Sequence, residues 1–168
     1  MKKPVYYFDL DGVTFLFKKV SVEETMKPRF FIDKMEKDPL ITFVIRKMFE
    51  NGEDVRFLSK YYTETNALAE KKESLVLNKL SDIPAVFVPY TENKFDYVNK
   101  NEFNVLIDDF SPNLFEWKKN GGVGIKYYNG VNGTKGTWRS YSVNRYMTAD
   151  ECINTITGIS EKILLKGA

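Results

Sequence analysis

The sequence contains no histidine and only one cysteine, Cys152. The absence of histidine removes the usual general base and the commonest zinc ligand. A single cysteine excludes a disulfide within the chain and favours a reducing, cytoplasmic location. Any chemistry in this chain therefore relies on carboxylates, Lys, Ser, Thr, Tyr or the one thiol.

A strong excess of either charge is also lacking. The 25 Lys and Arg residues nearly balance 23 Asp and Glu residues, leaving a net charge of +2. Such a chain offers no electrostatic reason to expect a membrane surface or a stably bound nucleic acid as partner. No run approaches the ~20 apolar residues of a membrane span. Acidic residues interrupt the first apolar run too early for a signal peptide.

At 168 residues, 43% of them hydrophobic, the chain is expected to form one domain, residues 1–168, with a sizeable core. Strand-like apolar runs alternate with helical patterns along it. The predicted strands are residues 4–10, 54–59, 85–90, 103–109 and 123–128; the predicted helices are about 39–51, 65–80, 93–99 and 111–122, and one from about 149. This alternation predicts an α/β fold with a doubly wound parallel sheet.

The helix predicted from Pro39 has the clearest pattern. Leu40, Phe43, Val44 and Met48 have the spacing of one helix face, and the Asn-Gly pair at 51–52 is a stop signal. Two segments show no such period. Residues 14–38 mix aromatic and charged residues. The Gly-rich stretch 129–138 lacks the spacing of a P-loop, and we expect it to form a surface loop near the functional site.

Polar side chains follow three of the predicted strands. Asp9 and Asp11 end the first, Ser59 ends the second, and Asp108 and Asp109 end a later one. Ligands of parallel α/β sheets bind at the carboxyl ends of the strands, near a topological switch point. The acids are therefore predicted to meet in one crevice.

Carboxylates held this closely repel one another, by roughly 4 kcal/mol per pair at 4 Å under an effective dielectric of 20. Either some of them are protonated or a cation lies among them. Oxygen ligands without His or Cys favour Mg²⁺, which leaves coordination places for water and phosphate oxygens. The pattern thus indicates a phosphate site, to which Lys94 can add positive charge.

The motifs "FDLDGV" and "LIDD", with Ser59 and Lys94 between them, resemble the haloacid-dehalogenase-like (HAD) phosphatase superfamily. The resemblance covers residues 4 to about 128 and implies a Rossmann-like core with a small helical cap insertion, residues 14–38, after the first strand. Within the superfamily the chain looks most like the 5′(3′)-deoxyribonucleotidases. The matching positions are Gly12-Val13, Phe30-Phe31, Asn93-Lys94, Leu106 to Asp109, and Asn129.

The resemblance implies a role for each acid. Asp9 would be the nucleophile that forms an aspartyl-phosphate. Asp11 would protonate the leaving alkoxide and later deprotonate water, while its backbone carbonyl binds Mg²⁺. Asp108 and Asp109 would anchor the metal together with Asp9.

Two more residues complete the implied catalytic set. Ser59 would bond a phosphate oxygen, and Lys94 would neutralise charge on the nucleophile and the phosphoryl group. The sequence therefore predicts a Mg²⁺-dependent phosphomonoester hydrolase. The resemblance implies a 5′-nucleotidase similar to the deoxyribonucleotidases.

Substrate-binding residues are inferred from the same resemblance. Phe17 matches an aromatic residue that lines the base pocket of the deoxyribonucleotidases, and Phe30 and Arg29 are nearby candidates. Lys60 stands where that family has a serine, which adds charge near the nucleoside. The short cap suggests a more open site. A nucleoside monophosphate is the expected substrate, and a homodimer is compatible with the pattern.

Several alternatives stay open at this point. The chain could be a phospho-accepting signalling or binding domain without turnover, although receiver domains place their acids after different strands. It could also act on a sugar phosphate or a polynucleotide 3′ end, the latter disfavoured by the near-neutral charge. The Phe residues at 15, 17, 30 and 31 equally suit core or cap packing.

Overall fold

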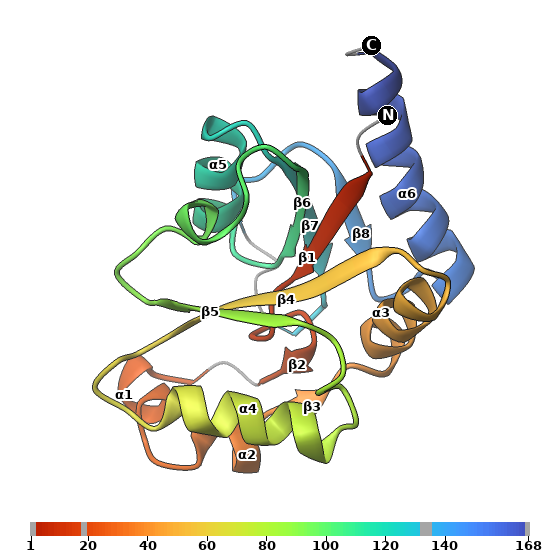
Figure 1. Ribbon diagram of the computed structural model, residues 1–168. Helices are drawn as coiled ribbons and strands as arrows, with labels where there is room; N and C mark the ends of the chain where they lie inside the picture. The colour runs from red at the N-terminus through yellow and green to blue at the C-terminus, as the bar shows by residue number, and fades with distance from the viewer. Residues whose placement is uncertain (1–2, 18–19, 132–135, 167–168) are drawn as a thin grey trace.

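The computed structural model describes residues 3–17, 20–131 and 136–166. At its centre lies a six-stranded sheet with the order β5-β4-β1-β6-β7-β8, in which all neighbours run parallel (Figure 1). The strands are β1 (Pro4–Phe8), β4 (Asp54–Tyr61), β5 (Ala85–Pro89), β6 (Phe103–Asp108), β7 (Val123–Tyr128) and β8 (Ser142–Asn144). The predicted α/β fold is confirmed.

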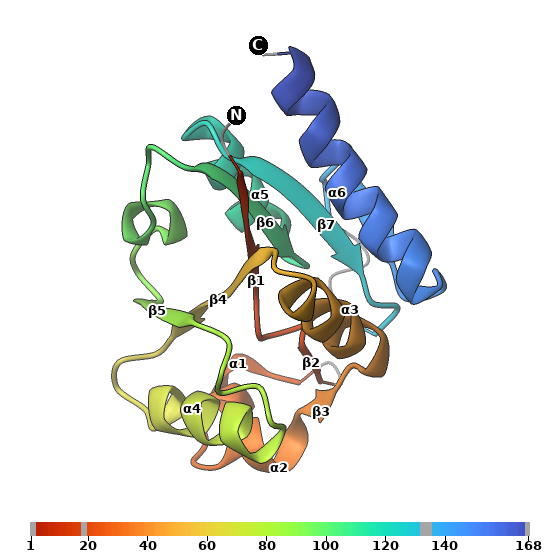
Figure 2. The same cartoon turned by 45° about the vertical axis from the view of Figure 1, so that its right-hand side comes forward.

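Both faces of the sheet are buried, as a parallel sheet requires. In β1, Tyr6 and Phe8 belong to the core that includes residues of α3 (Pro39–Glu50) and α6 (Ala149–Lys166). Val5 and Tyr7, which alternate with them, pack in the opposite core with residues of α5 (Ser111–Lys119). Figure 2 shows α3 and α6 together on one side of the sheet.

Helix α3 begins and ends at the predicted signals. The Asp38 side chain accepts hydrogen bonds from the N–H groups of Leu40 and Ile41 at 2.9 and 3.1 Å, and Pro39 opens the helix. Gly52, with φ of +82°, follows its end. The predicted buried face is wrong at Phe43, which is 55% exposed, because the buried stripe runs instead through Ile41, Val44, Ile45 and Met48.

The segment between β1 and α3 forms β2 (Phe15–Leu16), α1 (Val22–Thr25), α2 (Phe30–Lys34) and β3 (Glu36–Lys37), with β2 and β3 paired antiparallel. Helix α4 (Ala67–Leu77), which connects β4 to β5, packs against α2. Figures 1 and 2 place α1, α2 and α4 together at one end of the molecule, apart from α5 and α6. We refer to these three helices as the α1/α2/α4 group.

Glu70 joins two members of this group. Its buried carboxylate accepts hydrogen bonds from the backbone N–H groups of Arg29 at 2.5 Å and Phe31 at 3.0 Å. These are donors at the beginning of α2, which no earlier turn of that helix could satisfy. The Glu70 side chain of α4 thereby caps the N-terminus of α2 and holds the two helices together.

Several predicted boundaries differ from the structure. The first strand ends at Phe8 because Asp9 opens a turn that uses Gly12 at φ +74°. The helix predicted near 93–99 is a single 3-10 turn, η1 (Lys94–Tyr97). Strands β2, β3 and β8 are too short to give a sequence pattern. Residues 132–135 of the Gly-rich stretch lie outside the described residues. In the part of the chain that is described, every helix is too short or too polar to cross a membrane.

Candidate active site

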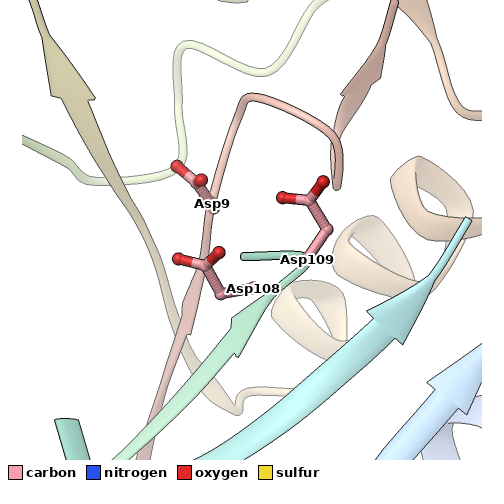
Figure 3. A group of neighbouring side chains, drawn as sticks. All are labelled: Asp9, Asp108 and Asp109. Atoms are coloured by element: carbon pink, nitrogen blue, oxygen red, sulfur yellow. The ribbon is translucent and has the colours of Figure 1, made fainter. Parts of the chain in front are cut away.

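Three carboxylates meet at the ends of β1 and β6. These strands are neighbours in parallel register, with Phe8 opposite Ile107, so the residues that follow them lie at the same sheet edge. Asp9, Asp108 and Asp109 each bring one carboxylate oxygen to within 4.8 Å of the others, and all three are buried (Figure 3). The structure thus brings together three of the four acids that the sequence predicts to converge.

Lys94 lies against two of these acids. Its ammonium group donates to Asp108 Oδ2 at 2.7 Å and lies 3.1 Å from Asp9 Oδ1, with only 3% of the side chain exposed. Asp108 also accepts from the Asn113 amide at 2.9 Å and the Phe110 N–H at 2.7 Å. Asp108 is therefore held in one orientation by partners from two segments, η1 and the N-terminal end of α5.

The three carboxyl groups of Asp9, Asp108 and Asp109 outnumber the one ammonium group of Lys94 that lies against them. Burial raises the pKa of Asp9 to about 6; Lys94 opposes the shift, whereas Asp108 adds to it. Burial and the neighbouring acids also raise the pKa of Asp109 well above its ordinary value. For Lys94, burial favours the neutral amine, but Asp108 and Asp9 outweigh burial and raise its pKa. A site with these properties gains electrostatic stability from an added cation.

Asp11 belongs to a second cluster beside the first. The Ser59 hydroxyl, two residues before the end of β4 at Tyr61, donates to Asp11 Oδ2 at 2.9 Å. Lys71, on α4, donates to the same Asp11 oxygen and to Ser59 Oγ at 2.9 Å. The Lys71 side chain is buried, whereas that of Asp11 is 39% exposed. The sequence analysis predicts Asp11 and Ser59 here but not Lys71.

The loop between Asp9 and Phe15 is fixed by its own hydrogen bonds. The Thr14 hydroxyl donates to the Asp9 carbonyl at 2.7 Å, and the Gly12 N–H donates to the Phe15 carbonyl at 2.8 Å. From the loop after β7, the Asn129 amide donates to the Gly12 carbonyl at 2.6 Å. These bonds hold the backbone that carries Asp9 and Asp11.

A cavity of about 390 Å³ opens beside the acids. Its lining includes Asp9, Asp11 and Asp109, the predicted substrate-binding residues Phe17, Phe30 and Lys60, and further aromatic residues Phe31, Tyr61, Tyr62, Tyr90 and Phe110. Tyr62 and Tyr90 stack with ring centroids 4.3 Å apart.

Arg29 differs from the other predicted substrate-binding residues. Its exposed guanidinium pairs with Asp33 at 3.3 Å, and the residue is not part of the cavity lining. Phe31, whose ring packs edge-on against Phe15, lines the cavity from the same segment.

A third lysine lies behind the acidic pair. Lys126 on β7 is completely buried and donates to the Ser111 hydroxyl at 2.8 Å. Burial lowers its pKa, whereas the negative charges of Asp109 and Asp108 act in the opposite direction. The one signal for this residue in the sequence is a lone lysine within an apolar strand, "VGIKYY".

The fold of the chain is similar to that of several solved structures. An uncharacterized protein from Listeria monocytogenes serotype 4b superposes with a TM-score of 0.63 at 14% identity, over 97% of each chain. A putative HAD-like phosphatase from Mesorhizobium loti gives 0.58 at 10% identity, over 94% of this chain and 87% of that one.

A third structure is the D,D-heptose 1,7-bisphosphate phosphatase from B. bronchiseptica, complexed with magnesium and phosphate. It gives a TM-score of 0.55 at 13% identity, over 98% of this chain and 99% of that one. No family model and no curated protein sequence matches the chain. At these identities the likeness establishes the fold alone and leaves the chemistry to the residues of the site.

Proposed function

We propose that this chain is a HAD-like phosphatase that hydrolyses phosphomonoesters through a phosphorylated Asp9. The observation that carries the proposal is the cluster of Asp9, Asp108 and Asp109, joined by Lys94, at the mouth of a cavity. A fold shared with two proteins described as phosphatases supports the same chemistry.

The donor set of the site fits Mg²⁺. It consists of carboxylate oxygens, without the nitrogen or sulfur ligands that favour zinc. Asp9, Asp108 and Asp109 would hold the ion, with the Asp11 backbone carbonyl as a further ligand. When bound, Mg²⁺ would neutralise negative charge on the acids and on the substrate's phosphate.

The proposed reaction has two steps that use the same residues. Asp9 attacks phosphorus, the bond from phosphorus to the ester oxygen breaks, and Asp11 gives its proton to the leaving alkoxide. Water then attacks the aspartyl-phosphate, Asp11 takes a proton from that water, and inorganic phosphate leaves with Asp9 restored. Ser59 and Lys94 bind and neutralise the phosphoryl oxygens during both steps.

The cavity favours a nucleoside monophosphate as substrate. Flat bases stack on aromatic side chains, and Phe17, Tyr62 and Tyr90 all line the space next to Asp9. We also propose that residues 14–38 act as the predicted small cap and that α4 is its third helix, since Glu70 caps α2.

A sugar phosphate is the second candidate substrate. The heptose bisphosphate phosphatase has the same fold, and Lys27 and Lys60 in the cavity lining could bind a polar or doubly phosphorylated sugar. The cation of Lys60 lies 5.9 Å from the Tyr90 ring, so one end of the cavity offers both charge and an aromatic face.

One panel assay tests these proposals together. The protein with Mg²⁺ is given nucleoside monophosphates, sugar phosphates and p-nitrophenyl phosphate, and released phosphate is measured. We expect turnover that is lost in Asp9→Asn and on removal of Mg²⁺ by a chelator. No release from any ester would contradict the phosphatase proposal, and a long-lived phosphoryl adduct after acetyl phosphate treatment would favour a non-hydrolysing domain.

A further inference from the structure

Lys71 uses its whole hydrogen-bonding capacity inside the candidate site. Its ammonium group donates to Asp11 Oδ2, to Ser59 Oγ at 2.9 Å and to the Lys60 carbonyl at 2.6 Å. An ammonium group has three N–H donors, so none is left over for a substrate. Among the described residues, Lys71 is the one basic side chain paired with Asp11.

These contacts distinguish the two oxygens of Asp11. Oδ2 accepts one bond from Lys71 and one from the Ser59 hydroxyl. A proton placed on Oδ2 would point at groups that are themselves donors, so protonated Asp11 carries its proton on Oδ1. The same ammonium occupies a lone pair of Ser59 Oγ, which leaves that hydroxyl free to donate its hydrogen to Asp11 or to a phosphate oxygen.

Lys71 also connects the site to the α1/α2/α4 group. It is adjacent in sequence to Glu70, whose carboxylate caps α2 through Arg29 and Phe31. Consecutive residues of α4 thus bind the cap segment and the acid of the catalytic centre. The position of Asp11 therefore depends on how α4 is seated.

We propose that Lys71 is a positioning residue that fixes which oxygen of Asp11 carries the catalytic proton. This inference rests on the proposed function, in which Asp11 is the general acid. It predicts that replacing Lys71 lowers kcat/KM for esters whose leaving group must be protonated. For esters whose leaving group needs no proton, kcat/KM should change much less.

The test compares two leaving groups. The alkoxide of an alkyl phosphate, taken as the best alkyl ester of the panel, must be protonated, whereas p-nitrophenolate leaves without a proton. The ratio kcat/KM reports the steps up to aspartyl-phosphate formation. For Lys71→Met we expect a loss of about 10²-fold on the alkyl ester, the size typical of a mispositioned group, and a much smaller loss on p-nitrophenyl phosphate.

Four further variants are compared with Lys71→Met. Asp11→Asn should show the same selectivity with a larger loss, and Lys71→Arg should restore part of the alkyl activity because it keeps charge and donors. Lys72→Met is the matched control, since Lys72 is the exposed neighbour on the same helix and should leave both activities unchanged. Lys71→Gln replaces the Met variant should that one fail to fold.

Binding of inorganic phosphate in the presence of Mg²⁺, measured by calorimetry, should be nearly unchanged in Lys71→Met, because its donors do not reach the substrate. An equal loss on both esters, or a large loss of phosphate affinity, would overturn the positioning role while leaving the phosphatase intact. A wild-type protein that hydrolysed neither ester would instead overturn the proposed function and this inference with it.

Discussion

The ammonium group of Lys94 lies between the carboxylates of Asp9 and Asp108, 3.1 Å from one and 2.7 Å from the other. Removing one partner of a buried ion pair leaves the other charge uncompensated, which typically costs about 3–5 kcal/mol. Lys94→Met should therefore lower the free energy of unfolding by roughly that amount near neutral pH and abolish turnover. Denaturant unfolding and the phosphate-release assay measure the two effects.

Lys100→Met is the control for this variant. Lys100 pairs with Asp96 at 2.9 Å, but both side chains are more than half exposed. Exposed pairs contribute about 0–1 kcal/mol, so this change should leave stability and activity almost unaltered. Equal losses in the two lysine variants would contradict a special role for Lys94.

The stability of the metal-free protein should depend on pH through the acidic cluster. Folding raises the pKa of Asp9 to about 6, because burial disfavours its charged form. Burial raises the pKa of Asp109 well above its ordinary value for the same reason. The folded state then holds protons that the unfolded state releases, so stability is greatest below the unfolded pKa and declines as pH rises through about 6. Thermal unfolding from pH 4.5 to 8 in a chelator tests this decline.

Mg²⁺ should reverse much of that decline, because binding to the folded state alone stabilises it. Asp109→Asn should reduce both the decline and the Mg²⁺ effect, whereas Asp150→Asn, at an exposed position on α6, should change neither. A melting temperature that is insensitive to Mg²⁺ at pH 8 would argue against a metal at this cluster.

Glu70 is predicted to hold the α1/α2/α4 group together. In Glu70→Gln an amide N–H₂ replaces one oxygen and faces a backbone donor of Arg29 or Phe31, which leaves a buried donor unsatisfied. Such a defect costs about 1–3 kcal/mol. Hydrogen exchange should become faster over residues 29–34, while Glu73→Gln, exposed on the same helix, should leave it unchanged. Unaltered exchange in Glu70→Gln would contradict this role.

The aromatic lining of the cavity leads to a prediction about the binding of a nucleoside base. Tyr62, stacked on Tyr90, should contribute to binding a base, at about 1–3 kcal/mol per stacked base. Tyr62→Ala should therefore raise KM for a nucleoside monophosphate by roughly 5- to 150-fold, with little change for glycerol phosphate. Tyr146→Ala, at a residue that is 85% exposed, is the control. A similar rise for both substrates would disfavour the nucleotide and leave the sugar phosphate as the better candidate.

Much of the site could be predicted because its residues follow strands. An apolar run that ends in Asp9 or Asp108 identifies a buried strand, and it shows that the acid lies at the carboxyl edge of the sheet. Ser59 and Lys94 can be identified from their order along the chain, between the two acidic motifs. In the structure Lys94 forms ion pairs with Asp9 and Asp108, and the Ser59 hydroxyl donates a hydrogen bond to Asp11.

Lys71 could not be found in this way. Its surroundings, "ALAEKKESLVL", have the composition of a solvated helix, and nothing in the spacing distinguishes Lys71 from Lys72. Its burial depends on α4 packing against α2, a tertiary contact that no local pattern encodes. Strand β8, only three residues long, was missed because so short a segment gives no periodicity.

The proposed reaction requires a covalent bond between Asp9 and phosphorus, and quenching the reaction in acid traps that bond. Acid preserves an aspartyl-phosphate long enough for the mass of the intact chain and of its peptides to be measured. With Mg²⁺ and a phosphate ester, we expect an added phosphoryl group on the peptide that contains Asp9, and none in Asp9→Asn. Rapid turnover with the phosphoryl group on another residue, or an unchanged yield of adduct in Asp9→Asn, would contradict it.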